Sequence, residues 1–418
     1  MRFALLGDHP DGVDMARALI ASGRHELAAL TALPPKGRVV GEEIPIRPGS
    51  PPTLATRHPP PATRHEILDL EEVLADPVIE AVIVAGRPAD RPGQLRRSLQ
   101  SERHVLCVHP ADQTPDTAYE AALIQGDTGM VLLPLLTERL HPAVTRLRGW
   151  IQDPTGPLGK FLLIEMERWS DGPVLLEPET PGQKPSFPGW DLLRSLGGEI
   201  AEVAGYAAGE IVLPEEPILI AGRFAPGGLL QVSLLPDQPE PRRRLLVLGS
   251  QGRAELTFPL GWPGPAQLRW RDRGGEWHEE AWDSWDPWPA LVQVFEAAVA
   301  QAGTTPATSR KGPAWLSWQD AVRCLELDDA ARRSIERRRA STLDYQEVSE
   351  EVGFKGTMTL AGCGLIWIML LLLILARWVP ALGWVILPLL AVFLVLQLLR
   401  WLLPRDPGDQ GVDTPRSP

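Results

Sequence analysis

Cysteine is scarce in this sequence, and acidic residues outnumber basic ones. Only 3 of the 418 residues are cysteine, at positions 107, 324 and 363, and no pair has the C-x-x-C spacing of a zinc or redox site. This pattern argues against a disulfide framework, indicates a reducing compartment and predicts no metal site. The 41 lysine and arginine residues against 53 aspartate and glutamate residues give a net charge of −12. Phosphate contacts need a surplus of basic side chains, so we expect no nucleic-acid partner.

The N-terminal residues lack a signal-peptide core, since only about four apolar residues precede Gly7. The C-terminal end is different. Residues 357–376 and 378–399 contain no charged side chain, and each run matches the ~20 residues with which a helix crosses ~30 Å of hydrocarbon. We therefore expect a transmembrane helical hairpin over residues 357–403, in contact with a lipid bilayer. A pair of buried core helices, or one amphipathic helix, is the alternative.

Positive charge flanks the expected hairpin on both sides. An arginine-rich cluster at residues 332–339 and Lys355 precede it, Arg400 and Arg405 follow it, and only Arg377 lies in its turn. This bias predicts a membrane protein of the bacterial inner-membrane type with its soluble domains in the cytoplasm. The arginine cluster either touches anionic lipid heads or is a solvated helix end. Residues 341–356 are expected to be a juxtamembrane linker and residues 404–418 a disordered tail.

Residues 1–135 alternate between strand and helix patterns. Strands are predicted at 2–7, 25–30, 80–86 and 103–108, and helices at 12–23, 69–79 and 92–101. The uninterrupted apolar run at 80–86 is typical of a parallel sheet with both faces covered. This order predicts a doubly wound, Rossmann-like α/β domain of the dinucleotide-binding type. The proline-rich residues 34–61 are expected to be a long loop.

Residues 136–340 have a different pattern, in which short strand-like runs are separated by Gly or Pro turns. They predict an α+β domain with an open antiparallel sheet. Helices are expected at 190–209, 287–303 and 316–339. The strand-like runs are residues 160–169, 210–213, 218–224, 229–235, 243–249, 254–258, 266–272 and 276–282.

A glycine pattern follows the first predicted strand. Residues 5–12 read LLGDHPDG, where a dinucleotide-binding turn would have G-x-G-x-x-G. The outer glycines, Gly7 and Gly12, are present, and His9 stands at the middle position. Two later stretches follow at family-like spacing, ADPVIEAVIVAGRP at 75–88 and LQSERHVLCVHP at 99–110.

The order of these motifs resembles the glucose-fructose oxidoreductase/inositol dehydrogenase/MocA (Gfo/Idh/MocA) family over residues 1–339. The resemblance implies an N-terminal domain that binds NAD or NADP. It also implies a second domain whose open sheet presents a sugar or polyol to the nicotinamide. Family members commonly associate through that sheet, so a homo-oligomer is implied as well. The expected membrane hairpin lies outside the family pattern.

The resemblance places cofactor contacts at Gly7, His9 and Gly12 and in the turn after the third strand, at Arg87, Pro88 and Arg91. Gly7 can form the tight turn, and Gly12 lets the helix approach the strand. His9 puts a ring where backbone would approach the pyrophosphate, the next residue is a proline without an N–H, and aspartates stand at positions 8 and 11. The side chain of Arg91 either pairs with a phosphate or carboxylate or faces water.

The resemblance also assigns candidate catalytic residues. The family's E-K-P segment aligns with residues 108–110, so His109 replaces the lysine and is either a general base or merely tolerated there. The family's D-x-G-x-H-x-x-D signature aligns with residues 195–202. Ser195 then replaces the aspartate and Glu199 replaces the histidine. Glu199 is either a base with a pKa raised by burial or a solvated surface carboxylate.

Two classes of function follow from these replacements. One is a membrane-anchored NAD(P)-dependent oxidoreductase that acts on a sugar or polyol. The other is a catalytically inactive, membrane-tethered protein with a binding, regulatory or scaffold role. Its tryptophan- and proline-rich residues 258–292 would then dock another protein. The changed catalytic positions leave both open, because fold likeness alone does not establish an activity.

Overall fold

The structure is a computed structural model that describes residues 1–31, 66–112, 114–173, 175, 186–208, 213, 215–260, 264–302 and 316–343. All of the elements below belong to one unit, residues 1–344. The expected loop at 34–61, the hairpin at 357–403 and the tail at 404–418 lie outside the described residues. Among the helices that are described, none is long and apolar enough to span a membrane.

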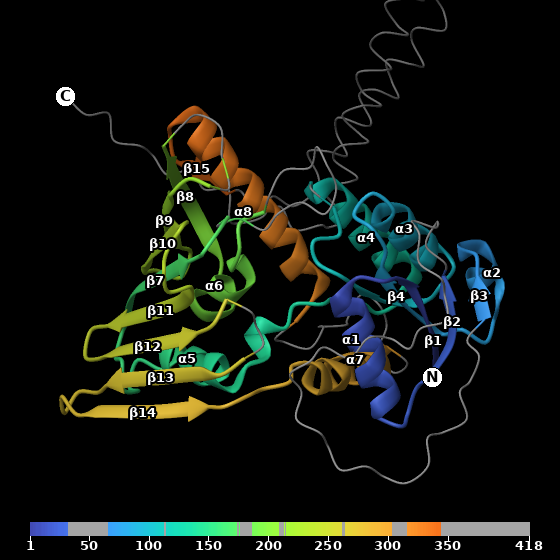
Figure 1. The fold of residues 1–418 in the computed structure, drawn as a ribbon, viewed down its shortest axis with the longest axis horizontal. Coiled ribbons are helices and arrows are strands. Elements are labelled where there is room, and N and C mark those ends of the chain that lie inside the picture. Colours follow the sequence, from blue (N-terminus) through green and yellow to red (C-terminus); the bar gives the residue numbers. More distant parts are fainter. Residues whose placement is uncertain are drawn as a thin grey trace, which may run out of the picture. The chain divides into compact units, whose positions relative to one another are not determined.

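A six-stranded parallel sheet forms the N-terminal part of the fold (Figure 1). Its strand order is β3-β2-β1-β4-β5-β6, the order of a doubly wound dinucleotide-binding sheet. The expected Rossmann-like domain is therefore confirmed. The strands are β1 (Arg2–Gly7), β2 (Glu26–Thr31), β3 (Glu66–Leu68), β4 (Ala81–Ala85), β5 (His104–Cys107) and β6 (Leu132–Pro134), and the helices between them are α1 (Pro10–Ala21), α2 (Leu70–Ala75), α3 (Arg91–Gln100) and α4 (Pro115–Thr128).

The apolar strand pattern arises because helices cover both faces of this sheet. Every residue of β4 is buried. Local signals set the helix ends: Asp69 and Glu72 form a capping box at the start of α2. Gly129 ends α4 in the left-handed conformation that glycine adopts without strain.

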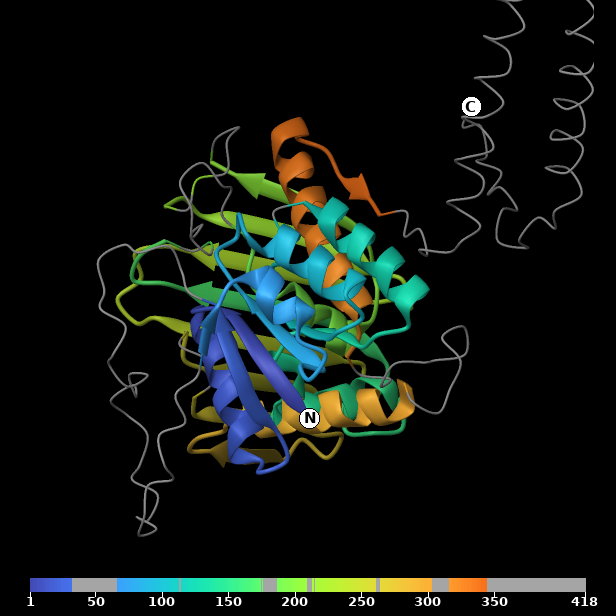
Figure 2. The ribbon, with the colours of Figure 1, turned by 90° about the vertical axis from the view of Figure 1, so that its right-hand side faces the viewer.

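Two late helices return to the parallel sheet, although the sequence placed them in the second domain. Helix α7 (Trp288–Ala302) lies beside α1 (Figure 2), and its Leu291 and Phe295 share a core with Phe3 of β1. Helix α8 (Trp318–Arg337) packs its first half against α4, where the Trp318 indole Nε1 donates to the Ala118 carbonyl over 2.8 Å. The N-terminal core thus includes segments that follow the predicted boundary at residue 135.

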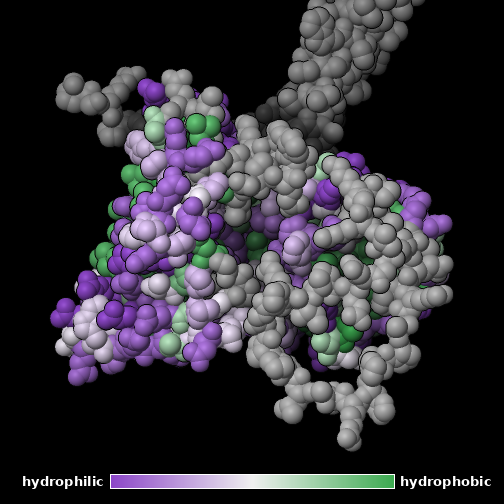
Figure 3. All heavy atoms as spheres, in the orientation of Figure 1, coloured by the Kyte–Doolittle hydropathy of each residue, from purple (hydrophilic) through white to green (hydrophobic). Residues whose placement is uncertain are grey.

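The second sheet has nine strands in the order β14-β13-β12-β11-β7-β10-β9-β8-β15. Helices α5 (Pro142–Gln152) and α6 (Trp190–Gly197) and the second half of α8 share a core with one face of it. Burial alternates along β10 and β11, as expected when one face is covered. Hydrophilic side chains gather over its β12–β14 end (Figure 3). The strands are β7 (Phe161–Trp169), β8 (Ile200–Ala207), β9 (Ile218–Phe224), β10 (Leu229–Leu235), β11 (Arg242–Gly249), β12 (Arg253–Phe258), β13 (Ala266–Arg271), β14 (Trp277–Trp282) and β15 (Ser341–Thr342).

The structure corrects two details of the second domain. The sheet is mixed, because β7 and β10 pair in parallel. The expected helix at 190–209 is a helix followed by a strand: α6 ends at Gly197, and β8 pairs with β9 from Ile200 onward. Gly198 has a φ of +86°, which breaks the helix, and a Cβ on Gly197 would lie 2.4 Å from the Phe224 ring.

Candidate active site

The turn between β1 and α1 has the geometry that its glycines predict. Gly7 has a φ of +109°, and a Cβ at that position would lie 2.3 Å from the Ala85 carbonyl oxygen. A Cβ on Gly12 would lie 2.3 Å from the Ala85 Cβ, so α1 can approach β4 only through a glycine. The structure thus contains the tight turn at Gly7 and the close helix contact at Gly12, and the contact of these residues with a cofactor stays a prediction.

His9 occupies the N-terminal end of α1. The imidazole Nδ1 accepts a hydrogen bond from the Asp11 backbone N–H at 3.2 Å, and the His9 backbone N–H donates to the Ala85 carbonyl. Pro10 is the first helical residue and has no N–H to offer. The imidazole therefore occupies the Asp11 N–H, a backbone donor that could otherwise bind an anion at this helix end.

The turn after β4 has a structural role for one of its arginines. Arg91 is fully buried, and its guanidinium donates from Nε to the Gly86 carbonyl at 2.7 Å and from Nη1 to the Pro110 carbonyl at 3.0 Å. Its burial shows that the alternative in which Arg91 faces water is wrong. Its pairing with a phosphate or carboxylate stays a prediction. Pro88 is buried, and Arg87 is exposed and paired with Asp90 at 2.9 Å.

A pocket of about 450 Å³ lies between the carboxyl ends of the parallel strands and the helix-covered face of the nine-stranded sheet. Asp11 of α1 and His109, just after β5, line it from the N-terminal side. Residues before and within α6, two arginines of β7 and β11, and Asp328 of α8 line it from the other side. The remaining lining residues are Pro110, Leu135–Glu138, Ser186–Asp191, Leu260, Cys324 and Leu325.

His109 is a neutral side chain in this pocket. It is partly buried, and its Nδ1 is shielded from solvent with no hydrogen-bond partner among the described residues. Burial, and secondarily the charge of Arg91, lower the pKa of His109 to about 4. A neutral imidazole has one acceptor and one donor nitrogen. His109 can therefore accept a hydrogen bond from a hydroxyl in the pocket.

Buried carboxylates line the second-domain side of the pocket. Asp191 of α6 accepts from the Arg139 guanidinium, with Nε to Oδ2 at 3.0 Å, and burial raises the pKa of Asp191. Asp328 accepts from the Phe187 backbone N–H at 2.7 Å and from Arg332 at 3.2 Å, and burial raises its pKa too. Within the described part of the chain, no three His, Cys, Asp or Glu side chains group as metal ligands would.

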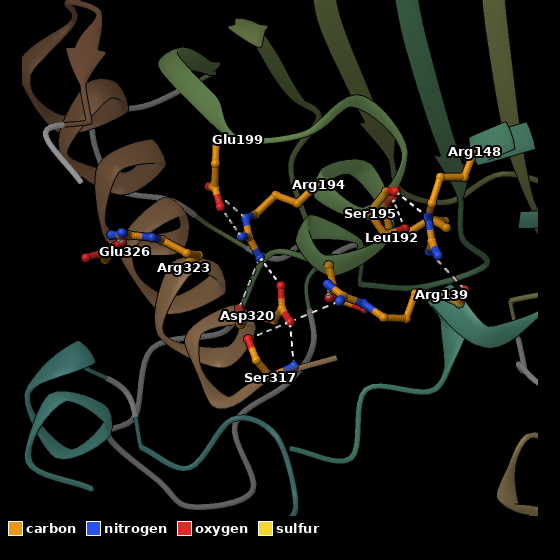
Figure 4. Close-up of polar contacts among 11 residues, drawn as sticks. Arg139, Arg148, Leu192, Arg194, Ser195, Glu199, Ser317, Asp320, Arg323 and Glu326 are labelled. Carbon is orange, nitrogen blue, oxygen red and sulfur yellow. Dashed lines mark hydrogen bonds and ion pairs between the residues drawn. The ribbon is translucent and has the colours of Figure 1, made fainter. Parts of the chain in front are cut away.

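The structure does not bring Ser195 and Glu199 to His109. Neither residue lines the pocket. Figure 4 shows the polar contacts that they make instead. The Ser195 hydroxyl donates to the Leu192 carbonyl at 2.8 Å, and Glu199 is paired with Arg194, with Nε to Oε2 at 3.2 Å. The residues of this region that do reach the pocket are 186–191. Asp191, in the first turn of α6, was not among the expected site residues.

Comparison with known proteins gives a fold. No family profile matches the chain, and no curated protein sequence matches it. Solved structures do match: levoglucosan dehydrogenase in complex with NADH has a TM-score of 0.62 at 14% identity, with 83% of this chain and 100% of that chain covered.

Two further solved structures have similar scores. An oxidoreductase from Agrobacterium radiobacter in complex with NAD+, L-tartaric acid and magnesium has a TM-score of 0.60 at 15% identity, covering 82% of this chain and 98% of its own. The WlbA dehydrogenase from Bordetella pertussis, in complex with NADH and UDP-GlcNAcA, has a TM-score of 0.59 at 14% identity, with 83% of this chain and 99% of that chain covered. The chain thus has the fold of a two-domain nucleotide-dependent dehydrogenase. Its structural neighbours are dehydrogenases of the Gfo/Idh/MocA type.

Proposed function

We propose that this chain is an NAD(P)-dependent oxidoreductase that interconverts a hydroxyl and a carbonyl group of a sugar- or polyol-like molecule. The observation that carries the proposal is the shared pocket. Asp11 in the first turn of α1 and His109 after β5 line one cavity together with Asp191 of the second domain. In doubly wound sheets, ligands bind outside the carboxyl ends of the strands, which is where this cavity begins.

The β1–α1 turn supports a nicotinamide dinucleotide as the cofactor. Gly7 allows the tight turn, and Gly12 allows the close approach of the helix, that pyrophosphate binding requires. The N-terminus of α1 carries the positive partial charge of the helix dipole. The His9 side chain lies near the surface at about 20% exposure, so its ring can leave the Asp11 N–H for the ligand. Such a cofactor supplies the hydride acceptor or donor. The aspartates at positions 8 and 11 oppose the binding of an anion and lower its affinity.

The chain's own residues orient the substrate. The neutral His109 ring would accept a hydrogen bond from the reacting hydroxyl, and Arg91 holds the strand end that carries it. This arrangement replaces a lysine with a weak, desolvated base. We therefore expect slow turnover at neutral pH.

The low pKa of His109 also favours a second candidate, a binding or regulatory protein without turnover. Two measurements on the full chain in detergent separate the two functions. NADH and NADPH titrations followed by fluorescence test the cofactor. Absorbance at 340 nm with a panel of sugars, polyols and their acids then tests turnover. Binding without an absorbance change would favour the second candidate, and no binding below millimolar concentration would contradict the cofactor site.

We further propose that residues 357–403 anchor the protein in a membrane, with the described domains on the cytoplasmic side. The support is in the sequence: two uncharged runs of membrane-spanning length, and basic residues on both sides of them. A homo-oligomer formed through the face of the nine-stranded sheet opposite to α5 and α6 also stays a prediction.

A further inference from the structure

Two arginines face each other across neighbouring strands in the pocket. Arg168 of β7 and Arg243 of β11 are direct partners in the antiparallel register. They share the helix-covered face with Met166 and Leu245, which are also paired and are buried. Both arginines line the pocket. Like charges directly opposite each other destabilise a sheet, so this pair is costly unless an anion compensates it.

Glu138 forms an ion pair with Arg243, and no ion pair joins a described carboxylate to Arg168. Arg243 is 3% exposed, donates from Nη1 to Glu138 Oε1 at 2.6 Å and stacks over the Phe258 ring at 4.1 Å. Arg168 Nε is shielded from solvent and has no hydrogen-bond partner in the described ranges. Burial and the neighbouring charge of Arg243 lower the pKa of Arg168, and Glu138 opposes this effect. Counted over the described residues, the two arginines and Glu138 leave an excess of one positive charge at this wall.

The other charged groups of the pocket do not cancel this excess. Asp191 is paired with Arg139, and Asp328 is paired with Arg332. His109 is neutral. Asp11 belongs to the α1 side of the pocket and is half exposed. The β7–β11 wall is therefore positive and partly desolvated, and it borders the cavity that holds His109.

We propose that Arg168 and Arg243 form a carboxylate-binding subsite and that the substrate is a sugar acid or a related hydroxy acid. A guanidinium presents two parallel N–H donors that match a carboxylate, and a desolvated pair of this kind binds more strongly than a surface pair. A monoanion neutralises the single excess charge. The reacting hydroxyl would then lie toward His109. The reaction rests on the proposed function, whereas binding of the acid can be tested without it.

The test is calorimetric titration of the full chain in detergent, without nucleotide, at one fixed ionic strength. D-glucuronate, D-glucose 6-phosphate and D-glucose are the probes. We expect glucuronate to bind at least about tenfold more tightly than glucose, with glucose 6-phosphate weaker than glucuronate. Equal binding of glucuronate and glucose, or tighter binding of the phosphate, would overturn the carboxylate subsite.

Variants of Arg168 test whether this side chain causes the tighter binding of glucuronate. Arg168→Gln removes the uncompensated charge and leaves the Arg243–Glu138 pair, so glucuronate affinity should fall about 10- to 100-fold with glucose affinity unchanged. Arg168→Lys keeps the positive charge but lacks the two parallel N–H donors of a guanidinium. Its glucuronate affinity should therefore lie between those of the wild type and Arg168→Gln. Arg223→Gln, on an exposed β9 residue whose side chain is 3.9 Å from Glu202, is the matched control and should bind as the wild type does. Unchanged glucuronate binding in Arg168→Gln would overturn the proposal. Glucuronate binding with no NADH binding or turnover would instead count against the oxidoreductase alone.

Discussion

The Arg91 guanidinium and the Pro110 carbonyl are joined by a partly buried hydrogen bond of 3.0 Å. The same guanidinium holds the Gly86 carbonyl at 2.7 Å. Arg91 thus connects the ends of β4 and β5, and the next residue back from Pro110 is His109. An arginine that the family likeness offered as a ligand contact thus also holds the strand end that carries the candidate catalytic imidazole.

Replacing Arg91 should destabilise the fold. Arg91→Met leaves one buried and one partly buried carbonyl group without these donors, and hydrogen bonds to a charged group contribute ~1.5–3 kcal/mol each. We expect a loss of roughly 3 kcal/mol in the free energy of unfolding, measured by urea titration. Arg87→Met, on the exposed neighbour paired with Asp90, should change stability by less than ~0.5 kcal/mol. Equal effects of the two variants would contradict the positioning role.

The approach of α1 to β4 can be tested with two glycines that are each the third residue of a helix. Gly12→Ala would put a Cβ 2.3 Å from the Ala85 Cβ, and overpacking of this kind costs ~1–3 kcal/mol. Gly93→Ala in α3 meets no atom within 4 Å and should stabilise by ~0.5–1 kcal/mol. Thermal unfolding of both variants measures the difference, and similar shifts in Tm would refute the close contact.

Removing the His9 ring should strengthen nucleotide binding. His9→Gly frees the Asp11 N–H and opens the space above the turn, so the Kd for NADH or NADPH should fall about 3- to 10-fold. Fluorescence titration measures it. His9→Ala, which keeps a Cβ, should lie between the wild type and His9→Gly. A His9→Gly protein that binds no better than the wild type would count against this turn as the cofactor site.

The depressed pKa of His109 predicts a specific pH dependence of stability. The folded pKa is about 4 and the unfolded value is ~6.5, so below pH ~6.5 the unfolded chain takes up a proton that the folded protein does not. The contribution is complete above pH ~6.5 and is lost as the pH falls toward 4, with a slope of up to ~1.4 kcal/mol per pH unit. Urea unfolding of His109→Gln between pH 4.5 and 7 should show a slope shallower by this amount. Identical slopes in the two proteins would disprove it.

Deleting the C-terminal segment tests the anchor. A chain that ends before Thr357 should move from the membrane pellet to the soluble fraction, because the two uncharged runs have been removed. The full chain, expressed in parallel and fractionated by ultracentrifugation, is the control. Continued recovery of the shortened chain in the pellet would show that another segment holds it there.

Several elements can be predicted from the sequence because their signals are local. The fully apolar run of β4, the capping residues of α2 and the spacing of Gly7 and Gly12 are set by neighbours in the chain, and the structure contains each of them. Alternation in the strands from β9 to β13 is equally local. The parallel sheet and the β-rich second domain could therefore be predicted.

Tertiary structure decided the composition of the site. The return of α7 and α8 to the first sheet and the parallel pairing of β7 with β10 depend on contacts between distant residues, which periodicity does not encode. The expected helix at 190–209 ends at Gly197, and Ser195 and Glu199 at that end do not line the pocket. The buried Arg91 links two strand ends by hydrogen bonds, and burial keeps His109 a neutral acceptor. The strand register places Arg168 opposite Arg243. Desolvation and register are properties of packed neighbours, so only the folded chain could assign these roles.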